Sequence, residues 1–282
     1  DLVAIKHLTA VLSGASVALA SGLAYQLAGR PVMVLTSLLG VFHFGHMVQA
    51  AAPNSEPLYG LLMVATLLGA TRVATPGWLP GALAGMATLV RVEFALCAVL
   101  LVAWMAIDQT DGEGRRRAAA FALGFALTLA PTTLVNWRNL DQYNRTRASS
   151  LPGPLPLFAP VTSYGAFTFA TANHERADGG FNWDLPGLVP PEGEASERLQ
   201  RGQLDLARPP VYHAYVDGYR IGLSWVTANP RSAVGLFRRK LAITLSAVDY
   251  GYLLDNVPVD VRGTRRPVDQ IHLPISAVTR LD

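Results

Sequence analysis

The stretch LPGALAGMATLVRVEFALCAVLLVAWMAI, residues 79–107, decides the fold, because it is apolar throughout except for Arg91 and Glu93 near its middle. As a single helix it would be about 43 Å long at 1.5 Å per residue, and Arg91 would lie near the middle of a bilayer. As two short helices joined by a turn at residues 91–93, it would place both charges at a membrane surface. We favour the two-helix interpretation, because each half is short for a complete crossing.

The arginines outside this stretch point the same way. With two helices, Arg30, Arg72 and the triple arginine at residues 115–117 all fall on one side of the membrane. With one helix, the triple arginine moves to the opposite side. Positive residues gather on the cytoplasmic side of membrane proteins. We therefore expect residues 51–57, the turn at residues 91–93 and the chain from Asn136 onward to emerge on the outer face.

The composition is that of a membrane protein. Of the 282 residues, 51% are hydrophobic and only 15% are charged, whereas a soluble domain has about 25% charged residues. The high apolar content and the net charge of +3 exclude a disordered chain. Cys97 is the only cysteine, which excludes an internal disulfide and a thiolate metal cluster. The arginines lie at the edges of apolar segments, so we expect no nucleic-acid partner.

Other apolar segments extend the pattern. A spanning helix needs roughly 20 apolar residues, and in lipid the backbone satisfies its hydrogen bonds as a helix. The further candidates are residues 8–28, 31–52, 57–70 and 118–135. The sequence thus predicts an all-α integral membrane protein with about six short or full spans, which occupy residues 1–136.

The second half of the chain is more polar. Residues 137–230 are rich in proline and aromatic residues, and we expect them to form a large outer-face (periplasmic) loop region with a helix from about residue 210 to 228. In residues 231–282, we expect residues 232–248 to form an amphipathic helix that lies at the membrane interface, because they carry Arg238, Arg239 and Lys240. A polar segment follows this helix.

Four stretches, in this order, resemble the GT-C superfamily of membrane glycosyltransferases, in particular the bacterial branch that includes mannosyl- and aminoarabinosyl-transferases. The four are APNSEPLYGLLM (52–63), GALAGMATLVRVEFALCAVLL (81–101), LGFALTLAPTTLVNWRNL (123–140) and SYGAFTFATANHERADGGFNWD (163–184). A fifth, weaker match is NPRSAVGLFRRKL at residues 229–241.

The resemblance implies that a sugar moves from a polyprenyl-phosphate carrier to an envelope glycan, lipid or protein acceptor on the outer face. It also implies a multi-pass protein of the bacterial inner (plasma) membrane, with membrane lipids as further partners. In the family, an acidic residue near the first outer loop serves as the general base. We expect that span and loop to precede Asp1, so that this chain is a fragment.

Glu56 matches a second outer acidic position of the family, where the carboxylate binds a divalent metal ion or positions the acceptor. His43 and His46 share a helix face and would complete a metal site with Glu56. Two simpler interpretations stay open. Glu56 would cap the helix that Pro57 opens, because a negative charge suits a helix start. The two histidines would then be polar lining of a cleft.

Arg91 matches a basic position of the family that contacts the carrier phosphate, and a guanidinium can bind phosphate through two hydrogen bonds. The alternative is an ion pair between Arg91 and Glu93 at the interface. We expect Glu93, Arg138 and Lys240 to be substrate-binding residues as well, with headgroup anchoring as the alternative for Arg138 and for Lys240 with its neighbours. A cluster of aromatic and amide side chains would form a sugar platform or the core of the loop region; it comprises Tyr164, Phe169, Asn173, Phe181 and Trp183.

Two other functions stay open. A transporter or flippase for a lipid-linked substrate would also need charges such as Arg91 and Glu93 near the membrane. Transporters commonly show paired halves with broken helices, and no such internal repeat is evident here. The other alternative is an inactive membrane scaffold of GT-C type.

Overall fold

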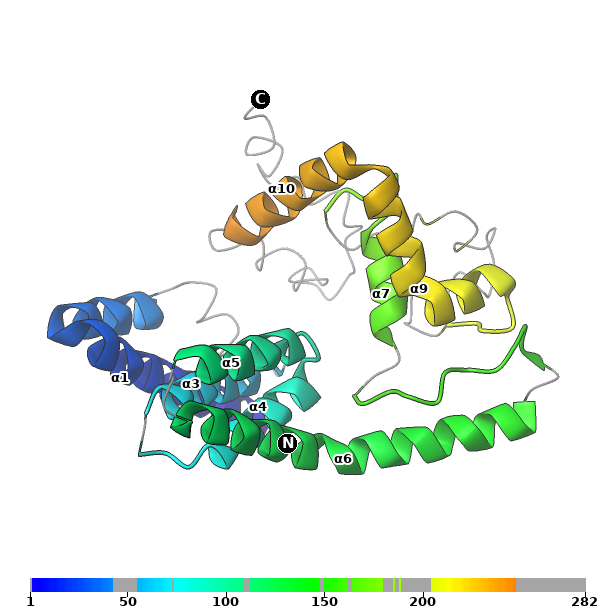
Figure 1. Cartoon of the computed structure of the whole chain (residues 1–282). Coiled ribbons are helices and arrows are strands. Elements are labelled where there is room, and N and C mark those ends of the chain that lie inside the picture. Colours follow the sequence, from blue (N-terminus) through cyan, green and yellow to red (C-terminus); the bar gives the residue numbers. More distant parts are fainter. Residues whose placement is uncertain are drawn as a thin grey trace. The chain divides into compact units, whose positions relative to one another are not determined.

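The computed structural model describes residues 2–42, 55–72, 74–108, 112–147, 150–161, 164–179, 185, 188 and 204–246. In this part of the chain there are eight helices and no strand (Figure 1). The prediction of an all-α protein is therefore confirmed for the described residues. The chain divides into two units, residues 1–57 with 237–282 and residues 58–236, which we describe separately.

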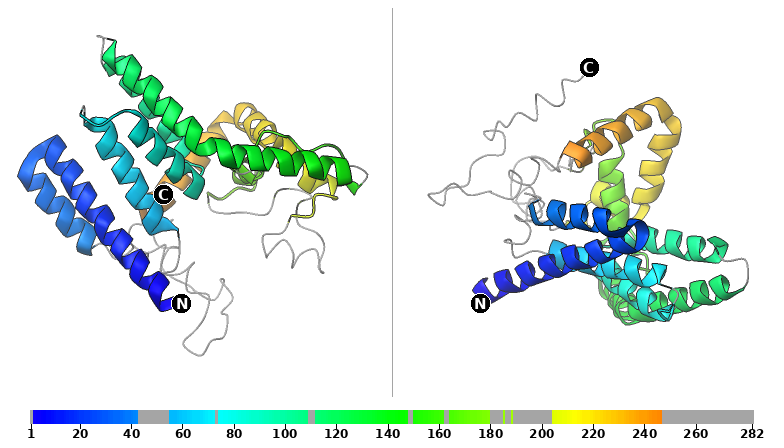
Figure 2. Two further views of the ribbon diagram at one scale, coloured as in Figure 1. Left: turned by 90° about the horizontal axis from the view of Figure 1, so that it is seen from below. Right: turned by 90° about the vertical axis from the view of Figure 1, so that its left-hand side faces the viewer.

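Helix α1 (Leu2–Phe42) is a hairpin of two helical arms. The chain reverses at Gly29, whose φ of 79° favours glycine, and Pro31 opens the second arm. The two arms fold back on each other (Figure 2), and Ser37 Oγ donates a hydrogen bond to Ser21 Oγ at 2.8 Å. The predicted break between residues 28 and 31 is thus confirmed.

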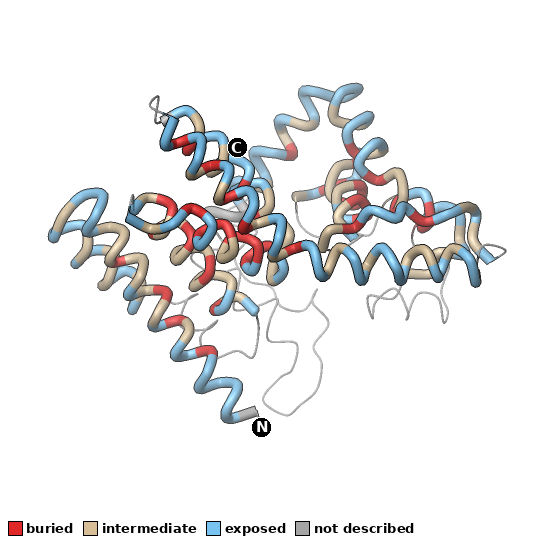
Figure 3. The backbone as a smooth tube through the Cα atoms, turned by 60° about the horizontal axis from the view of Figure 1, so that its bottom comes forward, coloured by how far each residue is buried: buried red, intermediate tan, exposed pale blue. Residues whose placement is uncertain are grey.

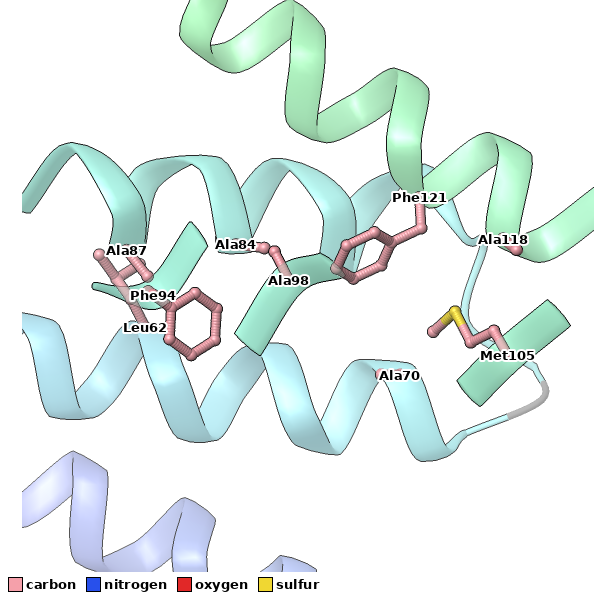
Figure 4. Close-up of a cluster of buried hydrophobic side chains, with 9 residues drawn as sticks. All are labelled: Leu62, Ala70, Ala84, Ala87, Phe94, Ala98, Met105, Ala118 and Phe121. Carbon is pink, nitrogen blue, oxygen red and sulfur yellow. The ribbon is translucent and has the colours of Figure 1, made fainter. Parts of the chain in front are cut away.

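The second unit begins with a bundle of α3 (Glu56–Thr71), α4 (Trp78–Val90), α5 (Phe94–Asp108) and the first half of α6 (Glu113–Arg147). Its core is built from alanines around a few large side chains (Figure 4). The core residues are Leu62, Ala70, Ala84, Ala87, Phe94, Ala98, Met105, Ala118 and Phe121. Because so many are small, the helix backbones approach one another closely.

Glycines set the distance between α4 and α6. A Cβ added at Gly81 would overlap the main-chain oxygen of Phe121, and one at Gly124 would overlap that of Trp78. A Cβ at Gly85 would lie 2.6 Å from Cβ of Thr128. Gly81 thus faces Phe121, and Gly85, one turn later in α4, faces Thr128, which also lies later in α6. The two helices therefore run parallel.

The 79–107 stretch forms two helices, as predicted. Helix α4 ends at Val90 and α5 begins at Phe94. In the turn between them, Arg91 N–H donates to Ala87 O at 2.8 Å, and Phe94 N–H donates to Arg91 O at 3.1 Å. At the opposite end of the bundle, the Arg117 guanidinium donates to Ala70 O and Arg72 O at 3.2 and 2.9 Å. Arg72 and Arg117 therefore lie at one end, as the two-helix interpretation requires.

The prediction of about six spans is not supported. By length and composition, two of the described helices could cross a membrane, Val3–Phe42 and Glu113–Thr146. Helices α3, α4 and α5 have 16, 13 and 15 residues. At 1.5 Å per residue they measure about 24, 20 and 22 Å, less than the roughly 30 Å of a hydrocarbon core.

The last described helices lie beyond α6. Helix α7 (Tyr164–Ala172) packs against α9 (Pro209–Ala228), which matches the helix expected at residues 210–228. Helix α10 (Pro230–Ser246) matches the expected amphipathic helix as far as Ser246. Helix α6 runs on across residue 136, where we had placed the end of the membrane region. In its final part, residues 131–146 include no buried residue (Figure 3).

Candidate functional site

An apolar groove of about 990 Å³ runs along the middle of α6. One wall comes from the end of α4 and the start of α5, and another from the segment at residues 157–161. Its lining residues include Thr88, Val92, Ala95, Phe125, Leu129, Thr133, Trp137, Leu157, Phe158 and Pro160. The hydroxyls of Thr88 and Thr133 already donate to main-chain oxygens, at 2.9 Å each within their own helices. The groove therefore suits an apolar ligand.

The proline-rich segment that forms one wall of the groove is hydrogen-bonded to three side chains of α6. Asn144 receives a hydrogen bond from Leu155 N–H at 2.8 Å and donates one to Leu155 O at 2.9 Å. Asn136 Nδ2 donates to Ala159 O and Val161 O at 2.8 and 3.1 Å. Thr133 Oγ1 is 3.2 Å from Pro160 O. Prolines in this segment have no N–H with which to form regular secondary structure. Hydrogen bonds from the three side chains of α6 to its main chain hold it against the helix instead.

The open edge of the groove is aromatic. Phe158 is 78% exposed and Trp137 is 45% exposed, although both line the groove. Large exposed aromatic side chains that border an apolar groove are typical of sites that bind lipid or another apolar partner.

Arg91 lies directly before Val92, a lining residue of the groove. Its Cζ atom is 6.0 Å from the centroid of the Tyr59 ring, a distance at which a cation and an aromatic face attract. Tyr59 in turn meets Phe94 edge-on, with 6.1 Å between ring centroids. Arg91 is thus held half-buried at the turn between α4 and α5.

Glu93 is exposed in the same turn, so the ion pair between Arg91 and Glu93 stays open beside the functional interpretation. Glu56 is the half-buried first residue of α3, one turn before Tyr59. A carboxylate in this place is favourable for the helix dipole, so the capping interpretation of Glu56 stays open beside the functional one.

The other predicted site residues are more scattered. Arg138 is exposed on α6, next to the lining residue Trp137. Lys240 is a half-buried residue of α10. His43 and His46, the expected metal ligands beside Glu56, lie outside the described residues. Among the residues that are described, no three His, Cys, Asp or Glu side chains form a group that would hold a metal ion.

Part of the predicted aromatic platform packs between α7 and α9, where Tyr164 is exposed and Phe169 is half-buried. Tyr164 meets Tyr215 edge-on at 6.1 Å, and Phe169 lies 5.6 Å from Tyr219 between ring centroids. Asn173 Nδ2 donates to Phe169 O at 2.8 Å. Phe181 and Trp183 lie outside the described residues. Tyr164 and Phe169 thus lie at the edge of the α7–α9 core, and the platform and the local-core interpretations both stay open.

The groove was missed by sequence reasoning. One signal was present: Asn136 and Asn144 are eight residues apart on one helix, and a proline-rich segment follows them. Comparison with protein-family models, with curated proteins and with solved structures gave no match to this chain. A function is therefore proposed from the site and from the five resembling stretches.

Proposed function

We propose that this chain is part of a membrane glycosyltransferase of GT-C type, in which the apolar groove along α6 binds the lipid of a polyprenyl-phosphate-linked sugar. The observation that carries the proposal is the position of Arg91. Arg91 directly precedes Val92, a lining residue of the apolar groove of about 990 Å³, so a cationic residue is the chain neighbour of that end of the groove. An isoprenoid phosphate combines the same two features, an apolar chain and an anionic end.

Each part of the ligand has a physical partner. The isoprenoid chain enters the groove from the bilayer, so close packing against the apolar lining, and not release from water, stabilises it there. The Arg91 guanidinium binds the phosphate by charge-assisted hydrogen bonds, and Tyr59 holds the guanidinium in place. Arg138 lies beside Trp137 and supplies further positive potential.

In the reaction, an acceptor hydroxyl attacks the anomeric carbon of the sugar while the bond from that carbon to the phosphate oxygen breaks. The hydroxyl proton passes to a general base, and polyprenyl phosphate leaves with its negative charge. Arg91 stabilises that charge as it develops. Glu56 positions the acceptor. The general base is not assigned to a residue of this chain.

We also propose a multi-pass location in a bacterial plasma membrane. The first arm of α1 and the apolar part of α6 would cross the bilayer, and the short helices α3 to α5 would be enclosed by neighbouring protein. The turn at residues 91–93 and the chain after Asn136 would then face outward. This arrangement brings the mouth of the groove to the outer leaflet.

A blocked groove tests the proposal. The full chain, reconstituted in lipid nanodiscs, would be incubated with a polyprenyl phosphate that carries a photoreactive diazirine. Ala126 is exposed and lines the groove, whereas Ala122 is exposed one turn earlier and does not line it. We expect Ala126→Trp to abolish cross-linking along α6 and Ala122→Trp to preserve it. Equal cross-linking in both variants would reject the groove as the lipid site.

A second assay separates the functions. With the complete protein of which this chain is proposed to be a part, radiolabelled sugar on polyprenyl phosphate would be followed to an acceptor fraction and, in parallel, across the bilayer of a vesicle. Glu56→Gln should abolish transfer while thermal stability stays nearly unchanged. An equal loss of stability would instead favour the helix cap. Movement of the carrier across the bilayer without transfer would identify a flippase, and the absence of both would identify a scaffold.

A further inference from the structure

Helix α10 carries an exposed apolar strip. Val234, Phe237 and Leu241 are spaced by three and four residues, so they lie on one face of the helix. Their exposed fractions are 54%, 65% and 47%. Leu236 is a buried apolar residue of the same helix, at 4% exposure, and it lies away from the strip.

The same helix is strongly basic. Residues 230–246 include four Arg or Lys residues and no Asp or Glu. At about 100° per residue, Arg231 and Arg238 border one side of the apolar strip and Lys240 borders the other. Arg239 lies on the opposite face. Arg231, Arg238 and Arg239 are exposed, and Lys240 is half-buried.

We propose that α10 docks on an anionic lipid surface, with Val234, Phe237 and Leu241 among the upper acyl carbons and the flanking basic side chains against lipid phosphates. An apolar strip with cations on both borders matches the layered chemistry of a bilayer surface, in which hydrocarbon lies below a negative headgroup layer.

Charge complementarity favours the bilayer over other occupants. A nucleic acid would use the cations but leave Phe237 and Leu241 in water. A protein groove would cover the apolar strip without requiring cations along both of its borders. The proposal does not depend on the groove along α6 or on its ligand, so it stands or fails separately from the proposed glycosyltransferase.

Spin labels on two faces of α10 test the docking. In a Cys97→Ser background, a nitroxide would be attached to Val234→Cys or to Arg239→Cys in the full chain. The protein would be reconstituted in nanodiscs of phosphatidylcholine, with or without phosphatidylglycerol. Relaxation by oxygen, which dissolves in lipid, would be compared with relaxation by a water-soluble nickel chelate.

With phosphatidylglycerol present, we expect the label at position 234 to be relaxed by oxygen and the label at position 239 by the nickel chelate. Without the anionic lipid, both labels should be relaxed by the chelate. A label at position 234 that is shielded from both reagents in either lipid would show that a protein surface covers the strip, and it would overturn the proposal. Equal chelate access at both positions in both lipids would overturn it as well.

Charge removal gives the second readout. Arg231→Ala and Arg238→Ala should each lower the ratio of docked to undocked α10 about fivefold, the usual effect of one basic residue at an anionic surface. Arg239→Ala, on the opposite face, is the matched control and should lower it less. Equal effects of all three variants would contradict docking by this face.

Discussion

Two helix pairs in this protein pack by the same backbone device in different chemical surroundings. In the α4–α6 pair, Gly81 and Gly85 bring α4 against Phe121 and Thr128. In the α7–α9 pair, a Cβ at Gly218 would overlap Ala166 O, and a Cβ at Gly222 would lie 2.7 Å from Phe169 Cδ1. Helices α4 and α9 therefore each present two glycines, four residues apart, to a closely packed neighbouring helix.

The side chains around these glycines differ. The core around α4 and α6 consists of alanine, phenylalanine, leucine and methionine. The core around α7 and α9 includes Tyr212 and Tyr215, and the Tyr212 hydroxyl donates to Pro154 O at 2.7 Å. The spacing of the glycines thus predicts that two helices pack closely, but it does not predict how polar the side chains around them are. The surrounding core is apolar at the first pair, whereas it includes hydroxyl-bearing tyrosines at the second.

The largest effect is expected at Gly81. Gly81→Ala places a Cβ on the main-chain oxygen of Phe121, and neither backbone can move without displacing its helix. We expect the free energy of unfolding to fall by about 3 kcal/mol, measured by denaturation with SDS in mixed micelles.

Two variants calibrate that loss. Gly14→Ala in α1 is the control, because no atom lies within 4 Å of its added Cβ; alanine there should stabilise the helix by about 0.5–1 kcal/mol. Gly218→Ala should destabilise less than Gly81→Ala, because α7 has only nine residues and can shift more easily. If Gly81→Ala and Gly14→Ala behave alike, the close approach of α4 and α6 is wrong.

A smaller effect is expected at Asn144. Asn144→Ala leaves Leu155 N–H and Leu155 O without their hydrogen bonds to α6. We expect a loss of about 1–3 kcal/mol and faster proteolysis within residues 151–161. Asn144→Asp keeps the acceptor for Leu155 N–H and should lose less. The control is Asn139→Ala, because Asn139 is an exposed residue of the same helix. If this variant is cleaved as fast as Asn144→Ala, the hydrogen bonds between Asn144 and Leu155 do not hold the segment in place.

The smallest effect is a pH dependence in the α7–α9 pair. Burial, and then the charge of Asp217, raise the pKa of Tyr212 above its usual 10.0. The stabilisation from this residue is therefore complete below pH 10.0 and is lost as the pH rises through the folded-state pKa. We expect Tyr212→Phe to flatten the fall in unfolding free energy above that pH. If the dependence of the unfolding free energy on pH is the same in Tyr212→Phe, the pKa of Tyr212 is not raised in the folded protein.

Sequence reasoning succeeded where one residue type controls the backbone. Glycine and proline mark the reversal in α1, charged residues mark the turn between α4 and α5, and prolines begin α9 and α10. It failed where partners are distant in sequence. Helix α6 continues past Asn136 because its amide side chains bond a segment that begins at residue 155, and the groove exists only once that segment is in place.

The span count failed for a related reason. Apolar content gives the number of short or full spans poorly, because helix length is set by the turns. Residues 91–93 divide one apolar stretch into helices of 13 and 15 residues, each too short by itself to cross a hydrocarbon core. Such helices need neighbouring protein in a membrane, and the glycine contacts between α4 and α6 provide it.

The most direct test of the central claim compares the binding of a polyprenyl phosphate with that of the corresponding polyprenol alcohol to the reconstituted chain. We predict that wild type binds the phosphate at least about tenfold more tightly. Arg91→Ala should lose this preference and bind the alcohol as before, and Arg145→Ala, which removes an exposed partner of Asp141, should keep it. An undiminished phosphate preference in Arg91→Ala would contradict the account.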